Sequence, residues 1–109
     1  MAEDKALRLL GLAARAGRVT VGSPLTCEAL KRSGRPCAVL LASDASANTA
    51  KRITYRTDYY NVPLFRLTVD GESLAVTVGK RGAGVAVVGI TEPSLAAAVC
   101  RELTAQKEN

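Results

Sequence analysis

The sequence predicts a single α/β domain, spanning residues 1–109, in which helices cover both faces of a central sheet. The length is common for one domain, and no linker, repeat or low-complexity tract divides the chain. Hydrophobic residues make up 48% of the chain, which is enough for a core, and the 23% of charged residues suits a soluble surface. Short β-branched or continuously apolar runs alternate with segments of helical periodicity. These three observations favour strands that alternate with helices.

The N-terminal third of the chain predicts a helix, a strand and a second helix. Apolar side chains recur on one helical face within residues 3–16, and the β-branched residues of 18–21 predict a short strand. Ser23 is a favourable N-cap, and Pro24 suits the first helical position. The second helix is therefore expected to run from Ser23 to about Ser33.

The middle of the chain predicts a buried strand, a helix and a second strand. Residues 37–42 are continuously apolar, as a strand covered on both faces would be. Asp44 follows this strand and is expected to brace the turn, since the strand at 18–21 offers no acidic neighbour with which to hold Mg²⁺. A helix over 46–58 and a strand over 64–67 complete this part of the chain.

The C-terminal third predicts a short helix, a buried strand and a final helix. Two valines and a threonine within residues 73–78 favour a strand by propensity. The preceding Asp70-Gly71-Glu72 and the glycine that follows are instead typical of helix boundaries, so we expect residues 70–78 to be helical. A buried strand is predicted over 85–90, and the last helix is predicted to begin near Pro93.

Basic residues are concentrated in the first half of the chain. There are 15 Lys and Arg against 10 Asp and Glu, which gives a net charge of +5. Residues 1–56 carry an excess of basic groups, whereas residues 57–109 are close to neutral. A basic half favours a polyanionic partner, most often nucleic acid, although a merely soluble cationic protein is the alternative. Aromatic residues make up only 4%, which argues against a base-stacking platform built from several rings.

Several classes of function lack the residues that they need. Without His there is no zinc-ligand set of usual spacing and no Cys–His or Ser–His pair, so neither an enzyme nor a metal or cofactor site is expected. The cysteines form no Cys-x-x-Cys pair and lie in apolar stretches, as thiols in a reducing compartment would: Cys27, Cys37 and Cys100. No apolar run reaches the roughly 18 residues of a membrane span. The N-terminus is charged, unlike a signal peptide, so we expect a cytoplasmic protein without a membrane partner.

A glycine-rich segment, Gly79-Lys80-Arg81-Gly82-Ala83-Gly84, precedes the last predicted strand. It lacks the Gly-Lys-Ser/Thr order of a P-loop and leads into a strand rather than a helix, so it is not expected to hold ATP. Its two cations, Lys80 and Arg81, could contact an RNA backbone. The alternative is a surface connection with solvated charges.

Three segments carry a family resemblance: LLGLAARAGRVTVG, LLASDASANTAKRITYRTDYYNVPL and VGKRGAGVAVVGITEPSLAAAV. Together they resemble, in register from about Leu9 to Val99, the bacterial YlxQ-type branch of the ribosomal protein L7Ae/L30e superfamily of kink-turn RNA-binding proteins. The resemblance implies a three-layer α/β/α sandwich on a four-stranded mixed sheet. It further implies no catalysis, and binding of sharply bent, structured RNA, with ribosome association. The implied RNA surface comprises Gly22 to Arg32 and Gly79 to Gly84.

The family's recognition motif is only partly present. Gly22 matches its tight glycine and Arg32 its basic residue near the helix end. Pro24 and Leu25 stand where an Asn–Glu pair is usual, and Glu28 stands where the family has its recognition lysine. The leading hypothesis is a monomeric RNA-binding domain, without a small-molecule substrate, that uses Arg18, Gly22, Ser23, Lys31, Arg32, Lys80 and Arg81. The alternative is a protein–protein interaction module on the same fold that has lost kink-turn recognition.

Overall fold

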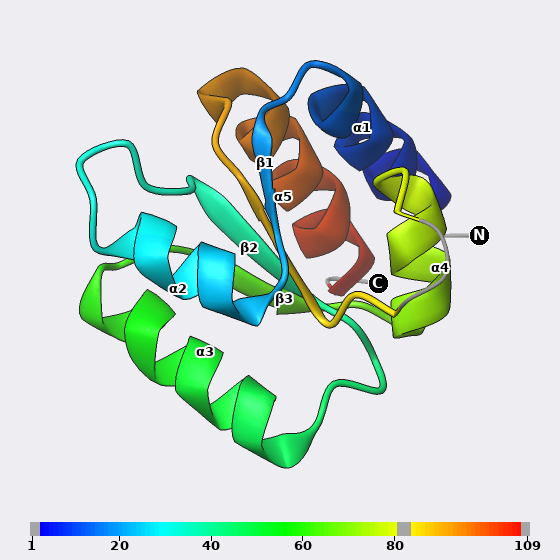
Figure 1. Ribbon diagram of the computed structural model, residues 1–109. Helices are drawn as coiled ribbons and strands as arrows, with labels where there is room; N and C mark the ends of the chain where they lie inside the picture. The colour runs from blue at the N-terminus through cyan, green and yellow to red at the C-terminus, as the bar shows by residue number, and fades with distance from the viewer. Residues whose placement is uncertain (1–2, 81–83, 108–109) are drawn as a thin grey trace.

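The four strands form one mixed sheet between two layers of helices, as the sequence predicts (Figure 1). The computed structural model describes residues 3–80 and 84–107. The strand order is β1-β4-β2-β3, with β2 and β3 parallel and β4 antiparallel to both of its neighbours. The strands are β1 (Val19–Val21), β2 (Ala38–Leu41), β3 (Leu64–Arg66) and β4 (Val87–Ile90).

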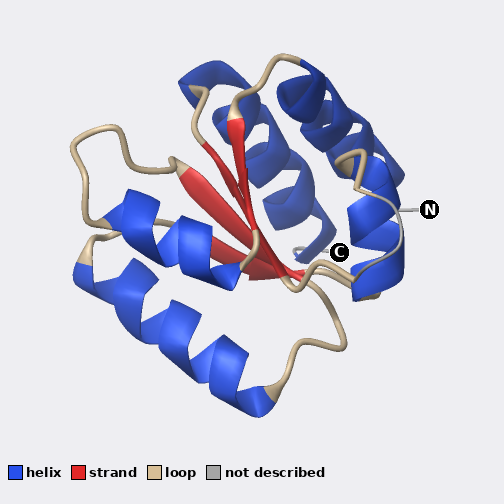
Figure 2. Cartoon of the chain, in the orientation of Figure 1, coloured by secondary structure: helices blue, strands red, loops and turns tan. Residues whose placement is uncertain are grey.

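Helices cover both faces of the sheet (Figure 2). On one face lie α1 (Asp4–Arg15), α4 (Gly71–Thr77) and α5 (Pro93–Lys107), and on the other lie α2 (Ser23–Leu30) and α3 (Ala47–Tyr59). Side chains of β2 alternate between two apolar clusters, with Ala38 and Leu40 toward the first layer and Val39 and Leu41 toward the second. All four are buried, which confirms the prediction of a strand covered on both faces.

The second helix differs from its prediction at both ends. Gly22 is the N-cap, with φ 96°, and its carbonyl accepts a hydrogen bond from the backbone N–H of Thr26 at 3.1 Å. The prediction that Ser23 caps the helix is therefore wrong by one residue: Ser23 takes the first helical position and Pro24 the second. Only glycine adopts such a positive φ without strain, so the chain turns into the helix at Gly22.

α2 ends at Leu30 rather than near Ser33. The backbone N–H groups of Lys31 and Arg32 each donate to the carbonyl three residues earlier, at 3.2 and 3.1 Å, so the last turn tightens and the α-helix stops. Arg35 then donates from Nε to the carbonyl of Leu30 at 3.0 Å and satisfies one acceptor of the helix end.

The short helix predicted over residues 70–78 is confirmed as α4. A carboxylate oxygen of Asp70 accepts a hydrogen bond from the backbone N–H of Ser73 at 2.9 Å, which caps the helix and lowers the pKa of Asp70. Asp44 accepts from the backbone N–H of Gly71 at 2.8 Å, so it braces the turn after β2 against the start of α4. The other helices and strands begin and end within two residues of their predicted bounds.

Candidate nucleic-acid interface

Three helices begin at the same edge of the sheet. Because β1 and β2 are both antiparallel to β4, and β3 is parallel to β2, the strands β1, β2 and β3 all point toward this edge. We call it the C-terminal edge. The N-caps of α2, α3 and α4 lie there: Gly22, Ser46 and Asp70. Helix starts present backbone N–H groups and a partial positive charge, so this edge suits an anionic partner.

The segment before β4 returns to this same edge. The backbone N–H of Val85 donates to the carbonyl of Gly71 at 3.0 Å, and the carbonyl of Val87 accepts from the N–H of Gly22 at 2.8 Å. Lys80 is exposed, at the beginning of the segment. Arg81 lies outside the described residues. The end of the glycine-rich segment thus lies beside the start of α4, and β4, which follows it, contacts the start of α2.

The start of α2 is held firmly, although it offers few side-chain donors. The hydroxyls of Thr20 and Thr26 lie 2.9 Å apart and join β1 to α2. The hydroxyl oxygen of Ser23 is buried and has no hydrogen-bond partner among the described residues, so it does not face a ligand in this conformation. Pro24 has no N–H, and the side chain of Leu25 is 57% exposed. Recognition of a ligand at the start of α2 therefore relies on backbone groups and on the shape of the protein surface.

The other predicted cations lie at the opposite edge. Arg18 precedes β1 there, near Glu92 at the start of α5. Hydrogen bonds from the backbone N–H groups of Leu95 and Ser94 lower the pKa of Glu92, and the charge of Arg18 makes a smaller contribution. The ammonium of Lys31 lies 3.5 Å from the carboxylate of Glu28. Arg32 is exposed, just beyond the C-terminal end of α2. The predicted site residues that the structure describes therefore do not form one cluster. Gly22 and Ser23 lie at the start of α2, Arg18, Lys31 and Arg32 lie at the opposite edge, and Lys80 follows the end of α4 on the other helical layer.

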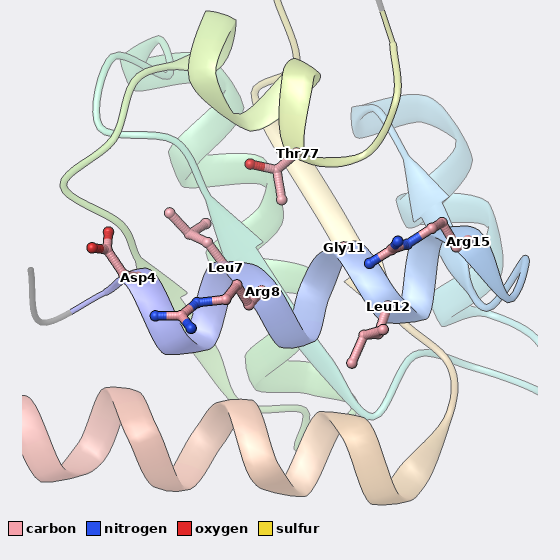
Figure 3. A pocket seen from close by; sticks show the side chains of 7 residues that line it. All are labelled: Asp4, Leu7, Arg8, Gly11, Leu12, Arg15 and Thr77. Atoms are coloured by element: carbon pink, nitrogen blue, oxygen red, sulfur yellow. The ribbon is translucent and has the colours of Figure 1, made fainter.

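A groove lies on the other helical layer, between α1 and α4 (Figure 3). Its volume is about 540 Å³, and Figure 3 shows Arg8 and Arg15 along α1 on either side of Gly11. A second hollow of about 300 Å³ shares Gly11, Arg15 and Thr77 and extends to Gly79. The groove therefore leads toward the end of α4 and the beginning of the glycine-rich segment.

One cationic and aromatic surface on α3 escapes the sequence-based prediction. We call it the α3 outer face, and it consists of Asn48, Lys51, Arg52, Tyr55, Arg56 and Tyr59. Tyr55 and Tyr59 are 72% and 73% exposed, whereas Ile53 and Thr57 on the same helix are buried. The signal that could have found it is the four-residue spacing of Lys51, Tyr55 and Tyr59, which puts them on one helical stripe opposite the buried one.

Residues 3–80 and 84–107 give little support for a metal site, a disulfide or a membrane span. No group of three or more Cys, Asp or Glu side chains is placed there to hold a metal ion. All three cysteines are free, and burial raises the pKa of the Cys100 thiol, with a smaller contribution from Cys37. No helix in this part of the chain is both long and apolar enough to cross a bilayer.

The layers and the strand order define a three-layer α/β/α sandwich on a four-stranded mixed sheet. The chain belongs to the Ribosomal protein L7Ae/L30e/S12e/Gadd45 family, which it matches over residues 4–99. It is 41% identical over 91 residues to the RNA-binding protein YlxQ of Bacillus subtilis (strain 168), covering 81% of this chain and 84% of that one. It is 40% identical over 77 residues to the RNA-binding protein YlxQ of Enterococcus faecium, covering 71% and 73%.

Solved structures share the fold. A protein with unknown function from Bacillus halodurans C superimposes with a TM-score of 0.83 at 27% identity, covering 92% of this chain and 97% of that one. The Giardia lamblia 15.5kD RNA binding protein superimposes with a TM-score of 0.76 at 17% identity, covering 91% and 84%. The second likeness concerns the fold alone.

Proposed function

We propose that this chain is a non-enzymatic RNA-binding protein. The observation that carries the proposal is its membership of the L7Ae/L30e family, together with 40% and 41% identity to two relatives named RNA-binding protein YlxQ. A net charge of +5 supports a polyanionic partner. The C-terminal edge, where three helix starts meet the glycine-rich segment, supplies the surface.

The RNA contacts are proposed to begin at Gly22 and Ser23, whose backbone can approach a ligand closely. Lys80 and Arg81, in the first half of the glycine-rich segment, are proposed to neutralise further phosphates. Arg32 and Lys31 lie roughly 13 Å further along α2, by the rise of an α-helix, and Arg18 lies at the same far edge. An RNA must therefore follow the length of α2 to reach the residues at both of its ends.

The RNA is proposed to be structured and sharply bent, like a kink-turn, and the protein is proposed to associate with the ribosome. The resemblance supports this, and we further propose that the protein acts as a cytoplasmic monomer. At the recognition positions, however, the chain has Pro24, Leu25 and Glu28. Pro24 and Leu25 offer no side-chain hydrogen bonds to base edges, and Glu28 can only accept them when ionised. Affinity for a standard kink-turn is therefore expected to be weak and to rest largely on phosphate contacts.

The test is a titration of two fluorescently labelled RNAs with the protein at several salt concentrations. One RNA contains a kink-turn, and the other is a continuous duplex of the same length. We expect tighter binding to the kink-turn, with affinity falling as salt rises because counterions are released from the phosphates. Equal binding to both RNAs contradicts the kink-turn proposal. The absence of binding to either RNA at low salt contradicts RNA binding altogether.

A protein–protein interaction module is the second candidate function. The observation that favours it is the groove between α1 and α4, which lies close to two exposed apolar side chains, Leu12 (48%) and Val76 (71%). Exposed apolar groups beside a groove are typical of protein-binding surfaces. Salt-dependent RNA binding in the titration favours the first function over this one.

A further inference from the structure

The α3 outer face is a stripe along the whole helix. At 100° per residue, its six members fall within one side of α3, and the buried Ile53 and Thr57 fall on the other. The members are Asn48, Lys51, Arg52, Tyr55, Arg56 and Tyr59, and the first four, with Arg56, line a hollow of about 430 Å³. The core therefore does not account for these residues, because they point away from it.

The face carries positive charge that no described carboxylate neutralises. Lys51, Arg52 and Arg56 form no ion pair with any carboxylate in the described part of the chain. Asp58 is the one acidic residue that α3 carries, and it flanks the face near the C-terminal end. Three cations at helical spacing, with one nearby acid, are complementary to a partner with repeated negative charge.

Two aromatic rings lie among these cations. Tyr55 and Tyr59 are one helical turn apart, about 6 Å along the axis, and both are more than two-thirds exposed. The ring of Tyr59 meets that of Tyr60 edge-on, with centroids 4.9 Å apart, and the guanidinium of Arg35 lies 4.8 Å from the centroid of Tyr60. Tyr59 is thus held in place by its neighbour while most of its surface stays in water. Tyrosine rings interleaved with Arg and Lys are the chemistry that stacks unpaired bases and holds their phosphates.

The position of α3 connects this face with the C-terminal edge. Ser46 caps α3 at that edge, where the hydroxyl accepts a hydrogen bond from the backbone N–H of Thr49 at 3.1 Å. From there α3 runs beside α2 in the same layer, away from the edge (Figure 1). An RNA bound at the start of α2 could therefore continue along α3 without crossing the other helical layer.

We infer that the α3 outer face is a second RNA-binding surface, which takes a single-stranded segment through base stacking on Tyr55 and Tyr59 and phosphate contacts from Lys51, Arg52 and Arg56. A double-stranded partner would leave both rings unused, because its bases are already stacked on one another. The inference goes beyond the proposed function, which concerns bent RNA at the C-terminal edge. A protein partner on this face is the competing outcome of the test.

Intrinsic fluorescence gives a direct readout, because the chain has no Trp and only three Tyr. All three are close together: Tyr55, Tyr59 and Tyr60. The probe is an unlabelled oligoadenylate about ten nucleotides long, a length within the range that single-strand-binding domains cover. We expect it to quench tyrosine emission. A ribose-phosphate oligomer of the same length without bases should quench much less, since it has nothing to stack.

Three variants separate stacking from charge. Replacing both Tyr55 and Tyr59 with Ala should weaken binding of the oligoadenylate, measured by anisotropy of a labelled copy, by at least about fivefold for each ring. Replacing both with Phe should preserve binding, because Phe still stacks, while the remaining emission of Tyr60 responds little to RNA. Replacing Arg52 and Arg56 with Gln should weaken binding and flatten its salt dependence.

Two control variants should bind like the wild type. Thr54→Ala lies on α3 but off the face, where the Thr54 hydroxyl donates to the carbonyl of Ala50 at 2.7 Å. Arg101→Gln removes an exposed cation from α5, on the other layer. The inference is overturned if the Tyr→Ala variant binds oligoadenylate as the wild type does, or if the oligomer without bases binds equally well. If the wild-type protein does not bind oligoadenylate at low salt, the inference is also overturned, and a protein partner for this face is favoured.

This result is independent of the kink-turn titration. A protein that binds a kink-turn but not oligoadenylate retains the proposed function and loses the second surface. A protein that binds oligoadenylate through Tyr55 and Tyr59 but shows no preference for a kink-turn retains the second surface and loses the proposed kink-turn recognition.

Discussion

The carboxylate of Glu28 lies 3.5 Å from the ammonium of Lys31, three residues further along α2. Both side chains are about half exposed, so this ion pair contributes little to stability. The ion pair instead offsets the positive charge of Lys31, which is predicted to contact RNA. By the resemblance, Glu28 also stands where a recognition lysine is expected. Glu28 is therefore the residue of α2 most directly opposed to RNA binding.

Replacing Glu28 with Lys should strengthen binding to a kink-turn RNA. The substitution removes a negative charge from the proposed RNA surface, releases Lys31 from its ion pair, and adds a donor for base-edge acceptors. If one good base contact is restored, the gain is expected to be ~1–3 kcal/mol. A fluorescence titration at fixed salt, comparing wild type and Glu28→Lys, measures it.

The variant Glu28→Gln separates the two effects of this change. It removes the charge and the ion pair with Lys31 but adds no cation, so it should recover only part of the gain. Equal gains from Gln and Lys would mean that release of Lys31 explains the effect and that position 28 makes no base contact. Tight wild-type binding that neither substitution alters would contradict the assignment of α2 as the recognition helix.

Replacing Lys80 and Arg81 together with Ala should weaken RNA binding by a similar factor for every RNA sequence. Both residues are proposed to contact phosphates, which carry no sequence information. The slope of log affinity against log salt should become shallower by roughly one for each lost contact. Titrations at several salt concentrations give that slope. An unchanged affinity and slope would show that the segment is only a solvated surface connection.

Local signals predict the helices well where they include caps as well as propensity. Residues 73–78 favour a strand by composition, yet they form the rest of α4 and its C-cap because Asp70 caps the helix and Gly71 fits against Val85. The Cβ of any other residue at position 71 would lie 3.1 Å from the Val85 carbonyl oxygen, so this glycine permits a close approach of two backbones. The residues at the helix boundaries therefore determine that this segment is a helix, although the β-branched residues between them favour a strand.

Residues that come together through strand order were harder to predict. Arg18 and Gly22 are four residues apart, but β1 separates them and puts them at opposite edges of the sheet. The predicted strand already implies this separation, but local signals do not show that β1 pairs with β4 and so brings Gly22 to the carbonyl of Val87. The α3 outer face escaped for another reason: an aromatic content of 4% says nothing about where the rings lie. All three tyrosines fall between positions 55 and 60, so a low total conceals a local concentration.

The stability of the protein in acid should depend on Glu92. Its carboxylate accepts hydrogen bonds from the backbone N–H groups of Leu95 at 2.7 Å and Ser94 at 3.1 Å, and these bonds, with a contribution from Arg18, lower the pKa of Glu92. A carboxylate with a lowered folded-state pKa stabilises the fold above its unfolded-state pKa, about 4.3 for Glu. This contribution is lost as the pH falls through the folded-state value.

The Glu92→Gln variant tests this dependence. Gln can still accept a hydrogen bond at the start of α5 but does not titrate, so its unfolding midpoint in urea should fall less steeply than that of the wild type below about pH 4.3. The two proteins should differ most near neutral pH and converge in acid. Parallel curves over the whole acid range would mean that ionisation of Glu92 does not stabilise the start of α5.

Gly89 is a glycine that packing requires, so Gly89→Ala should destabilise the protein by about 1–3 kcal/mol, the usual cost of overpacking a core. It lies in β4, opposite Thr20 of β1, and an added Cβ would be 2.5 Å from the Thr20 hydroxyl oxygen and 2.8 Å from Cγ of Pro36. The proline ring has little freedom to move, and the Thr20 hydroxyl is hydrogen-bonded to that of Thr26 in α2. Relief of the clash must therefore shift the start of α2. Gly34→Ala is the matched control, since its Cβ would meet nothing within 4 Å, and we expect a change within about 0.5 kcal/mol. Urea unfolding of both variants measures the difference, and equal midpoints would contradict this account of Gly89.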